Sequence, residues 1–207
     1  MTITEIALLC LAPNITTTNP SLRTNLAHAK TVMQNYTNHT FYYYQQVENP
    51  SLTYIFGEWD SLDQHMNHFV PSQDNQDVLE SLKDLLTVES LEHIDVSHAN
   101  LPLPKTEAEK EEARDGEVLL GLSRFFVKEG KRGEFERCVL REYIARGAQG
   151  GWRLDKEDGR EEWVLVSSLA RGVQQERYVN FVGDEGCGGV GEYVDEVEVT
   201  RAKLLDI

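Results

Sequence analysis

Apolar residues along the first hundred positions recur with the spacing of strands and of helices in alternation. Short apolar and aromatic runs predict strands over residues 4–11, 41–47, 52–59 and 88–96. One helix, beginning at Pro20, is predicted by apolar residues three or four positions apart: Leu22, Leu26, Ala29, Met33 and Tyr36. A second helical region, in two pieces that begin at Ser61 and Pro71, precedes the last strand. This order of elements is that of a ferredoxin-like βαββαβ unit.

The order of elements begins again after residue 116. Strands are predicted over residues 117–127, 152–154, 162–169 and 194–205. A helix after Gly133 would carry Phe135, Val139 and Tyr143 toward the core, and a weakly patterned helix would span residues 173–181. Residues 99–116 contain prolines and then many charges without an apolar stripe, which predicts a solvated connector that could be helical in part.

These patterns predict an α+β chain of two tandem ferredoxin-like units, residues 1–98 and 117–207, joined by a charged linker over residues 99–116. Each unit would have a four-stranded sheet with helices on one face and apolar side chains on the other. Two such sheets packed face to face would bury their apolar faces. We therefore expect an α/β barrel formed within one chain.

Charge and cysteine content restrict the class of protein further. The net charge of −15 argues against nucleic acid or a membrane surface as the partner, because both require a basic surface. Three widely spaced cysteines do not form a disulfide framework. The apolar run over residues 6–12 is too short to span a membrane and follows no basic residue. We expect a cytoplasmic protein whose partner is a small molecule, either a monomeric pseudo-dimer or a homodimer.

The stretch from Tyr54 to Phe69 is the strongest candidate for a site. An aromatic and β-branched run ends on Trp59, and residues 61–64, Ser-Leu-Asp-Gln, fit the capping box that begins a helix. Leu62, Met66 and Phe69 then recur at helical spacing, with His65 beside this apolar stripe and His68 further round. An indole and an imidazole would therefore lie near one corner between a strand and a helix.

Residues 57–66, Gly-Glu-Trp-Asp-Ser-Leu-Asp-Gln-His-Met, resemble the antibiotic-biosynthesis-monooxygenase (ABM) domain of the dimeric α/β-barrel superfamily. In that family a tryptophan at the end of a strand precedes a helix that carries a histidine. The resemblance covers residues 4–98 in element order and the second unit in topology alone. Family members are usually single units that dimerise, so the resemblance implies an internal pseudo-dimer, a form associated with fungal proteins. It also implies a pocket between the sheet and the helices of one unit.

The second unit departs from the family pattern. Aligning residues 173–176 with residues 62–65 places Ala170 opposite Trp59 and Glu176 opposite His65. Neither the indole nor the imidazole is kept. We therefore expect a site of this kind in the first unit, with the second unit serving mainly as its structural partner.

His65 is the candidate catalytic residue, as a general base toward a phenol or enolate, because the ordinary pKa of imidazole lies near neutrality. The alternative is a histidine that satisfies polar groups at the junction of helix and sheet. Trp59, Tyr43 and Tyr54 are candidate walls of the substrate pocket, although packing alone would also explain each ring. His68 is a further candidate substrate contact, with a solvated position as its alternative.

The sequence favours a reaction without a metal or organic cofactor. His65 and His68, with His93 and His98, could share a metal, but no local HxxxH or carboxylate motif supports such a site. Haem-degrading relatives carry an asparagine on the first strand, which residues 6–11 lack. The resemblance implies oxidation of aromatic or polyketide-type substrates in secondary metabolism, as a cofactor-independent monooxygenase or as an isomerase or cyclase. The alternative function is a non-catalytic small-molecule-binding or stress-related protein with the same barrel.

Overall fold

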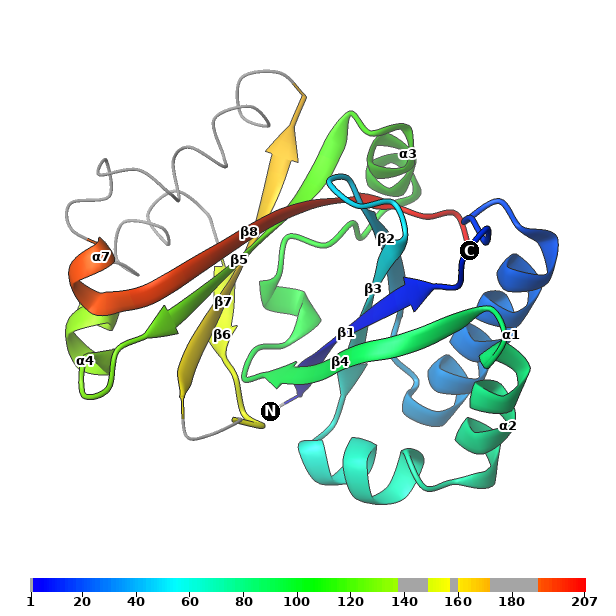
Figure 1. Cartoon of the computed structure of the whole chain (residues 1–207), viewed down its shortest axis with the longest axis horizontal. Helices are drawn as coiled ribbons and strands as arrows, with labels where there is room; N and C mark the ends of the chain where they lie inside the picture. Colours follow the sequence, from blue (N-terminus) through cyan, green and yellow to red (C-terminus); the bar gives the residue numbers. More distant parts are fainter. Residues whose placement is uncertain (1, 138–148, 157–159, 172–189) are drawn as a thin grey trace.

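The computed structural model describes residues 2–137, 149–156, 160–171 and 190–207. Within these residues the chain has a mixed α+β structure built on one eight-stranded sheet whose strand pairs are antiparallel (Figure 1). No helix in the described ranges has the length and apolar character needed to cross a membrane.

The first half of the chain follows the predicted order of elements. Its strands are β1 (Ile3–Leu11), β2 (Tyr42–Gln46), β3 (Leu52–Trp59) and β4 (Leu86–Ile94). Its helices are α1 (Pro20–Thr37), the π-helix η1 (Gln64–Phe69) and α2 (Gln73–Leu82), and they lie together on one side of this part of the sheet (Figure 1). The Asn19 side chain accepts a hydrogen bond from the Leu22 N–H and so caps α1, as the Asn-Pro pair predicts.

The second half repeats the strand order of the first. Its strands are β5 (Val118–Val127), β6 (Gln149–Trp152), β7 (Glu161–Ala170) and β8 (Val194–Leu204), with the short helices α4 (Arg132–Phe135) and α7 (Val190–Tyr193). The spatial order is β4-β1-β3-β2 in the first half and β8-β5-β7-β6 in the second. Val139, Tyr143 and the helix predicted over residues 173–181 lie outside the described residues.

The two halves pair along both edges, which closes the sheet into a barrel. On one side β2 pairs with β8. On the other side an isolated bridge joins Ile94 and Arg153, next to a hydrogen bond of 3.0 Å from the Asp95 N–H to the Trp152 carbonyl. A Cβ on Gly151 would lie 2.8 Å from Asp95 Oδ1, so glycine permits this approach. The sequence pattern placed this strand at residues 152–154. The strand β6 begins earlier than predicted, because its two glycines pair with β7 in the sheet.

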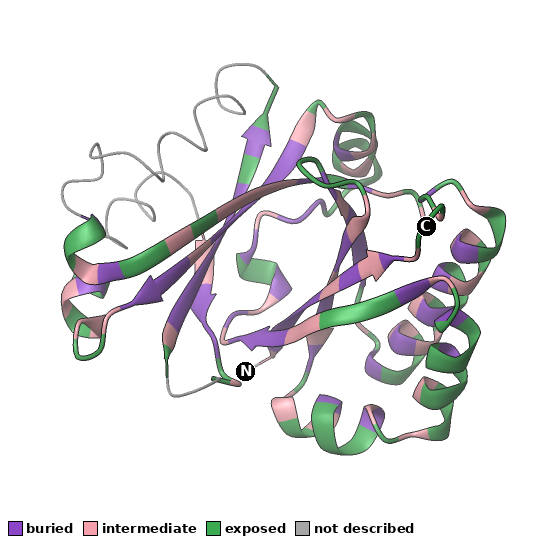
Figure 2. Ribbon diagram, in the orientation of Figure 1, coloured by how far each residue is buried: buried purple, intermediate pink, exposed green. Residues whose placement is uncertain are grey.

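Buried residues are concentrated on the strands, and on α1 and α2 they alternate with exposed ones (Figure 2). The interior cluster includes Ile6, Phe56, Leu122 and Val164 from four strands. A second cluster joins the outward face of β1–β4 to α1, η1 and α2. This second cluster contains Trp59 and surrounds the candidate site.

Residues 99–116 are partly helical, as the prediction allowed, but they are not solvated throughout, as it also stated. They contain the helix α3 (Glu107–Asp115), after the short 3-10 helix η2 (His98–Asn100). Leu101 and Leu103 are buried in the interior cluster, and the Tyr42 hydroxyl donates to the Pro104 carbonyl. The prediction is wrong here because a barrel has an open end that apolar side chains can fill, and two leucines are too few to give a periodic signal.

Candidate functional site

The corner after β3 has the predicted cap but a different helix. Ser61 Oγ accepts a hydrogen bond from the Gln64 N–H at 3.1 Å, while Gln64 Oε1 accepts one from the Asp60 N–H at 2.9 Å. The helix that follows is a π-helix, in which the Val70 N–H donates to the His65 carbonyl at 2.9 Å. Such π turns are rare in proteins overall, and those that do occur are often found at functional sites.

The π turn changes which side chains face the sheet. His65 and Phe69 are buried, whereas Met66, predicted to share the apolar stripe, is 38% exposed. The prediction for Met66 is wrong because the i→i+5 bond adds a residue to the turn and rotates that side chain outward. The His68 side chain is exposed and its Nε2 lies 3.2 Å from Asp63 Oδ2. His68 therefore lies on the solvent side of the helix, away from the buried site.

Trp59 fixes the position of two polar groups. Its ring stacks on the His65 imidazole with centroids 3.9 Å apart and planes at 7°. The indole Nε1–H donates a hydrogen bond of 2.6 Å to Glu5 Oε2. Because Trp59 is fully buried, it holds the imidazole and the carboxyl group as part of the packed core.

Glu5 is a buried acid at the centre of this site. It pairs with Gly57 across β1 and β3, and a Cβ on Gly57 would lie 2.7 Å from Glu5 Oε2. Burial raises the pKa of Glu5 to about 7, against the opposing effects of the Trp59 hydrogen bond and the charge of His93. The sequence interpretation missed Glu5. Its signal was available, since Glu5 is the one charged residue in β1.

His65 is the first member of a hydrogen-bonded series of three side chains. Its Nδ1 lies 2.6 Å from Nε2 of His93, and Nδ1 of His93 lies 3.0 Å from Asp155 Oδ2. Burial lowers the pKa of His65 to about 3, with a further lowering by the charge of His93 and an opposing effect of Asp155. The expectation of a near-neutral imidazole pKa is therefore wrong for His65. The sequence interpretation considered His93 only as a metal ligand and did not consider Asp155.

A cavity of about 280 Å³ lies between the outward face of β1–β4 and the helices α1, η1 and α2. Its walls are mostly aliphatic, and its polar side chains are Glu5, Tyr43, His65 and Asn75. The volume is near the lower end of the ~300–1,000 Å³ typical of small-molecule sites. This is the place that the family resemblance predicts, and it brings the candidates His65 and Tyr43 together.

Tyr43 lines this cavity, whereas Trp59 and Tyr54 do not. The Tyr43 hydroxyl donates to the Leu26 carbonyl at 3.1 Å, so its polar end is already satisfied within the wall. Trp59 lies behind His65 and supports it without lining the cavity. Tyr54 faces the barrel interior, where its hydroxyl lies 3.2 Å from both Gln46 and Thr200. Alternation along β3 places Tyr54 and Ile55 on opposite faces of the sheet.

A larger cavity of about 340 Å³ lies between residues 101–113 and β5. Its charged residues, Lys105, Glu109 and Glu112, are exposed to solvent. The smaller cavity is the better candidate site because buried acid and base groups face it, and such groups with shifted pKa values are typical of functional sites.

Four histidines were considered as possible metal ligands. Within the described ranges, no three histidine, cysteine or acidic side chains converge in a way that could hold a metal ion. His65 and His93 bond to each other, His68 is exposed, and the His98 N–H donates to Glu58 Oε1 at 3.2 Å.

Comparisons with known proteins identify the fold class. No family model and no curated protein sequence matches the chain. Among solved structures, a candidate monooxygenase from Lactobacillus acidophilus is 14% identical with a TM-score of 0.59, and the match covers 99% of both chains. An anthrone oxidase-like protein is 11% identical with a TM-score of 0.59, over 99% of this chain and 92% of that one.

A third solved structure, a candidate chlorite dismutase, is 11% identical with a TM-score of 0.61, over 99% of this chain and 95% of that one. The chain therefore has the fold of the dimeric α/β-barrel class. Its structural neighbours include proteins named as monooxygenase and as anthrone oxidase-like. At these identities the likeness extends to the fold alone.

Proposed function

We propose that this protein is an ABM-type, cofactor-independent monooxygenase that acts on a weakly acidic aromatic substrate, such as an anthrone or a related polyketide. The observation that carries the proposal is an apolar cavity faced by two buried acid–base groups, Glu5 and His65. The neighbours of monooxygenase and anthrone oxidase type support it at the level of the fold.

We also propose that the chain is a tandem of two ferredoxin-like units, residues 1–98 and 117–207. The strand order β4-β1-β3-β2, repeated as β8-β5-β7-β6, supports this division. Closure of the barrel through both edges supports an internal pseudo-dimer. Residues 99–116 then connect the units and also fill one end of the barrel with Leu101 and Leu103.

The first chemical step would remove a proton from the acidic CH₂ of an anthrone or from its phenolic tautomer. A mostly aliphatic cavity offers the resulting anion few polar groups to solvate it, which favours its reaction. Glu5, with its pKa raised to about 7, is ionised to a substantial extent near neutral pH. His65 is neutral in the same range and so offers a lone pair, although its lowered pKa makes it the weaker base of the two.

Oxygen would then react directly with the anion. One electron passes from the anion to O₂, and the radical pair combines to form a C–O bond and a peroxide. The acid–base pair returns its proton to the peroxide and removes the second C–H proton. The C=O bond forms, the O–O bond breaks and hydroxide leaves, to be protonated to water. The balance is CH₂ + O₂ → C=O + H₂O, without an external reductant.

The test is oxygen uptake by the purified chain with a 1,8-dihydroxyanthrone, corrected for the rate in buffer and followed by product analysis. We expect His65→Ala and Glu5→Gln each to lower kcat/KM by about 10²-fold or more, the size usual for an acid–base group. His68→Ala is the matched control and should keep the wild-type rate, since His68 is exposed. Prior treatment with EDTA should not change the rate.

Wild-type rates in both His65→Ala and Glu5→Gln would overturn the proposal. Tight binding of the anthrone to the wild-type chain with no oxygen uptake above the buffer rate would also overturn it. That second result would favour the alternative of a small-molecule-binding protein that uses the same cavity.

A further inference from the structure

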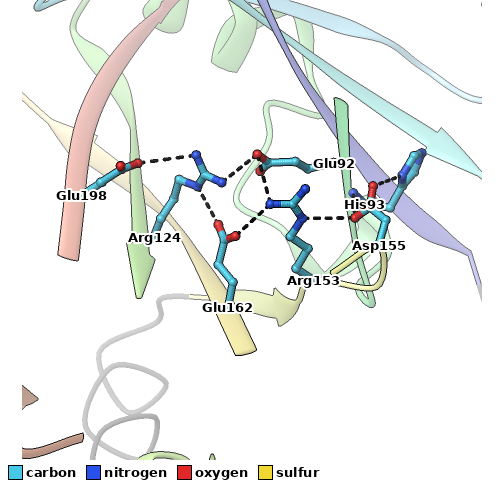
Figure 3. Close-up of polar contacts among 7 residues, drawn as sticks. All are labelled: Glu92, His93, Arg124, Arg153, Asp155, Glu162 and Glu198. Atoms are coloured by element: carbon cyan, nitrogen blue, oxygen red, sulfur yellow. Dashed lines mark hydrogen bonds and ion pairs between the residues drawn. The ribbon is translucent and has the colours of Figure 1, made fainter. Parts of the chain in front are cut away.

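Asp155 reaches the site from the other half of the chain. It lies just after β6, in the connection between β6 and β7, whereas His93 lies on β4 and His65 on η1. Figure 3 shows the Asp155 carboxylate facing the His93 ring, with Nδ1 to Oδ2 at 3.0 Å. The other carboxylate oxygen, Oδ1, accepts a hydrogen bond of 3.0 Å from the His93 backbone N–H. Both oxygens of one carboxylate are therefore used to hold one histidine.

Further side chains of the second half hold Asp155 in turn. Arg153 Nε lies 3.4 Å from Asp155 Oδ1, and Arg153 Nη1 donates to Glu162 Oε2 at 3.1 Å (Figure 3). Arg124 bridges Glu162 and Glu92, each at 2.6 Å, and so links this cluster to the first half. Such a fixed carboxylate can set the orientation and the tautomer of a histidine.

The hydrogen bonds determine where the protons lie when both histidines are neutral. An ionised carboxylate only accepts, so His93 must carry its proton on Nδ1 and leave Nε2 as an acceptor. His65 must then donate from Nδ1, at 2.6 Å, which leaves a lone pair on its Nε2. Within the described part of the chain no hydrogen bond reaches His65 Nε2, and His65 lines the cavity. The base would therefore face the place where a substrate binds.

We propose that Asp155 and His93 are positioning residues that hold His65 with its Nε2 lone pair toward the cavity and that receive the positive charge when His65 takes a proton. This proposal rests on the proposed function for its use in turnover. The proton positions themselves are a property of the free protein and do not depend on any substrate.

The transfer moves two protons and leaves His65 neutral. An N–H bond forms at His65 Nε2 as the N–H bond at His65 Nδ1 breaks, and that proton forms an N–H bond at His93 Nε2. The positive charge then lies on His93, 3.0 Å from the Asp155 carboxylate. Glu5 Oε2, 4.0 Å from His65 Nδ1, is the other acid beside the pair. This arrangement explains how a histidine whose own charged form is disfavoured by burial can still accept a proton.

We call the series His65, His93 and Asp155 the relay. Through Asp155, the relay gives the second half of the chain a chemical part in a site that the sequence places wholly in the first half. Residues 1–98 contain the cavity, His65 and His93, but not the carboxylate that sets their tautomers.

The test is nuclear magnetic resonance of the full chain labelled with ¹⁵N-histidine, at pH 8, where an ordinary imidazole is neutral. Long-range ¹H–¹⁵N spectra distinguish a protonated ring nitrogen from an unprotonated one. We expect the wild-type His65 to carry its proton on Nδ1. In Asp155→Asn, Oδ1 would still accept from the His93 backbone, and the amide would donate to His93 Nδ1. Both histidines should then change tautomer. His93 would carry its proton on Nε2, and so would His65.

Asp63→Asn is the matched control, because it makes the same change in the exposed pair of Asp63 and His68 on the same helical turn. It should leave the His65 tautomer unchanged. In the activity assay, Asp155→Asn should lower kcat by about 10²-fold or more with a much smaller change in KM.

A wild-type His65 protonated on Nε2 would overturn the relay, and this measurement requires no variant to fold. Unchanged His65 and His93 tautomers in a folded Asp155→Asn protein would overturn it as well. If the tautomers reverse as expected while the wild-type chain consumes no oxygen, the relay stands and the monooxygenase proposal fails.

Discussion

At the scale of single residues, burial acts in opposite directions on the pKa values of two neighbours. It raises the pKa of Glu5 to about 7 and lowers that of His65 to about 3. Both shifts have the same cause, since burial disfavours whichever form is charged. Between these values both Glu5 and His65 therefore favour their uncharged forms.

The Glu5 shift predicts how stability depends on pH. A folded-state pKa above the ordinary 4.5 gives stability that is fully present below pH 4.5 and is lost as pH rises through about 7. Glu5→Gln removes this dependence. Between pH 5 and pH 8 we expect the free energy of unfolding of Glu5→Gln to rise by about 2–3 kcal/mol relative to wild type. Urea titrations at both pH values measure this difference, and parallel curves for the two proteins would contradict it.

Gly57 leaves the space that the Glu5 carboxyl group occupies. In Gly57→Ala the new Cβ would lie 2.3 Å from the Phe41 ring, which is buried and packs edge-on against Trp59. We expect a loss of about 1–3 kcal/mol in the free energy of unfolding, the usual cost of overpacking. Gly133→Ala is the control, because nothing lies within 4 Å of its added Cβ. Equal urea midpoints for the two variants would contradict overpacking at Gly57.

At the scale of elements, local patterns predicted the strands and helices well where the signal is itself local. The cap at Asn19, the period of α1 and the aromatic run of β3 are examples. The π form of η1 was not predictable from its capping sequence, since it depends on His65 packing against Trp59 and bonding to His93. Burial of Leu101 was missed for a similar reason, because the space it fills belongs to the barrel.

The contact between β4 and β6 gives a prediction at this scale. In Gly151→Ala the added Cβ would lie 2.8 Å from Asp95 Oδ1, so this edge of the barrel should open. Hydrogen exchange should accelerate at the Leu154 amide, which donates to the His93 carbonyl at 2.8 Å. The Val47 amide, bonded to the Arg201 carbonyl at the opposite joint, should keep its wild-type rate. Equal acceleration at both amides would indicate general destabilisation instead.

At the scale of the whole molecule, the two halves are joined by buried charges as well as by strands. Arg124 on β5 bonds to Glu92 on β4 and to Glu162 on β7, and both carboxylates are buried (Figure 3). The repeated strand order was predictable from the repeated pattern of elements. The pairing of His93 with Asp155, 62 positions along the chain, was not, because no periodicity or motif relates two residues that meet only after the barrel closes.

Removing Arg124 should be costly because two buried acids, Glu92 and Glu162, lose their shorter ion pairs and are left to share Arg153. We expect Arg124→Met to lower the free energy of unfolding at pH 8 by about 3–5 kcal/mol. The loss should be smaller at pH 5, since burial already raises the pKa of Glu92 and Arg124 opposes that rise. Arg171→Met, which breaks an exposed pair with Glu117, should cost about 1 kcal/mol or less. Urea unfolding at the two pH values tests this, and similar losses for Arg124→Met and Arg171→Met would count against a buried network.

A crystal structure of the chain with bound 1,8-dihydroxyanthraquinone, the product of the proposed oxidation, would locate the substrate site directly. We predict that the rings occupy the cavity between β1–β4 and the helices α1, η1 and α2, with an oxygen atom within hydrogen-bond distance of His65 Nε2. Binding confined to the larger cavity beside Leu101 and Val118, with the cavity at His65 empty, would contradict the central claim.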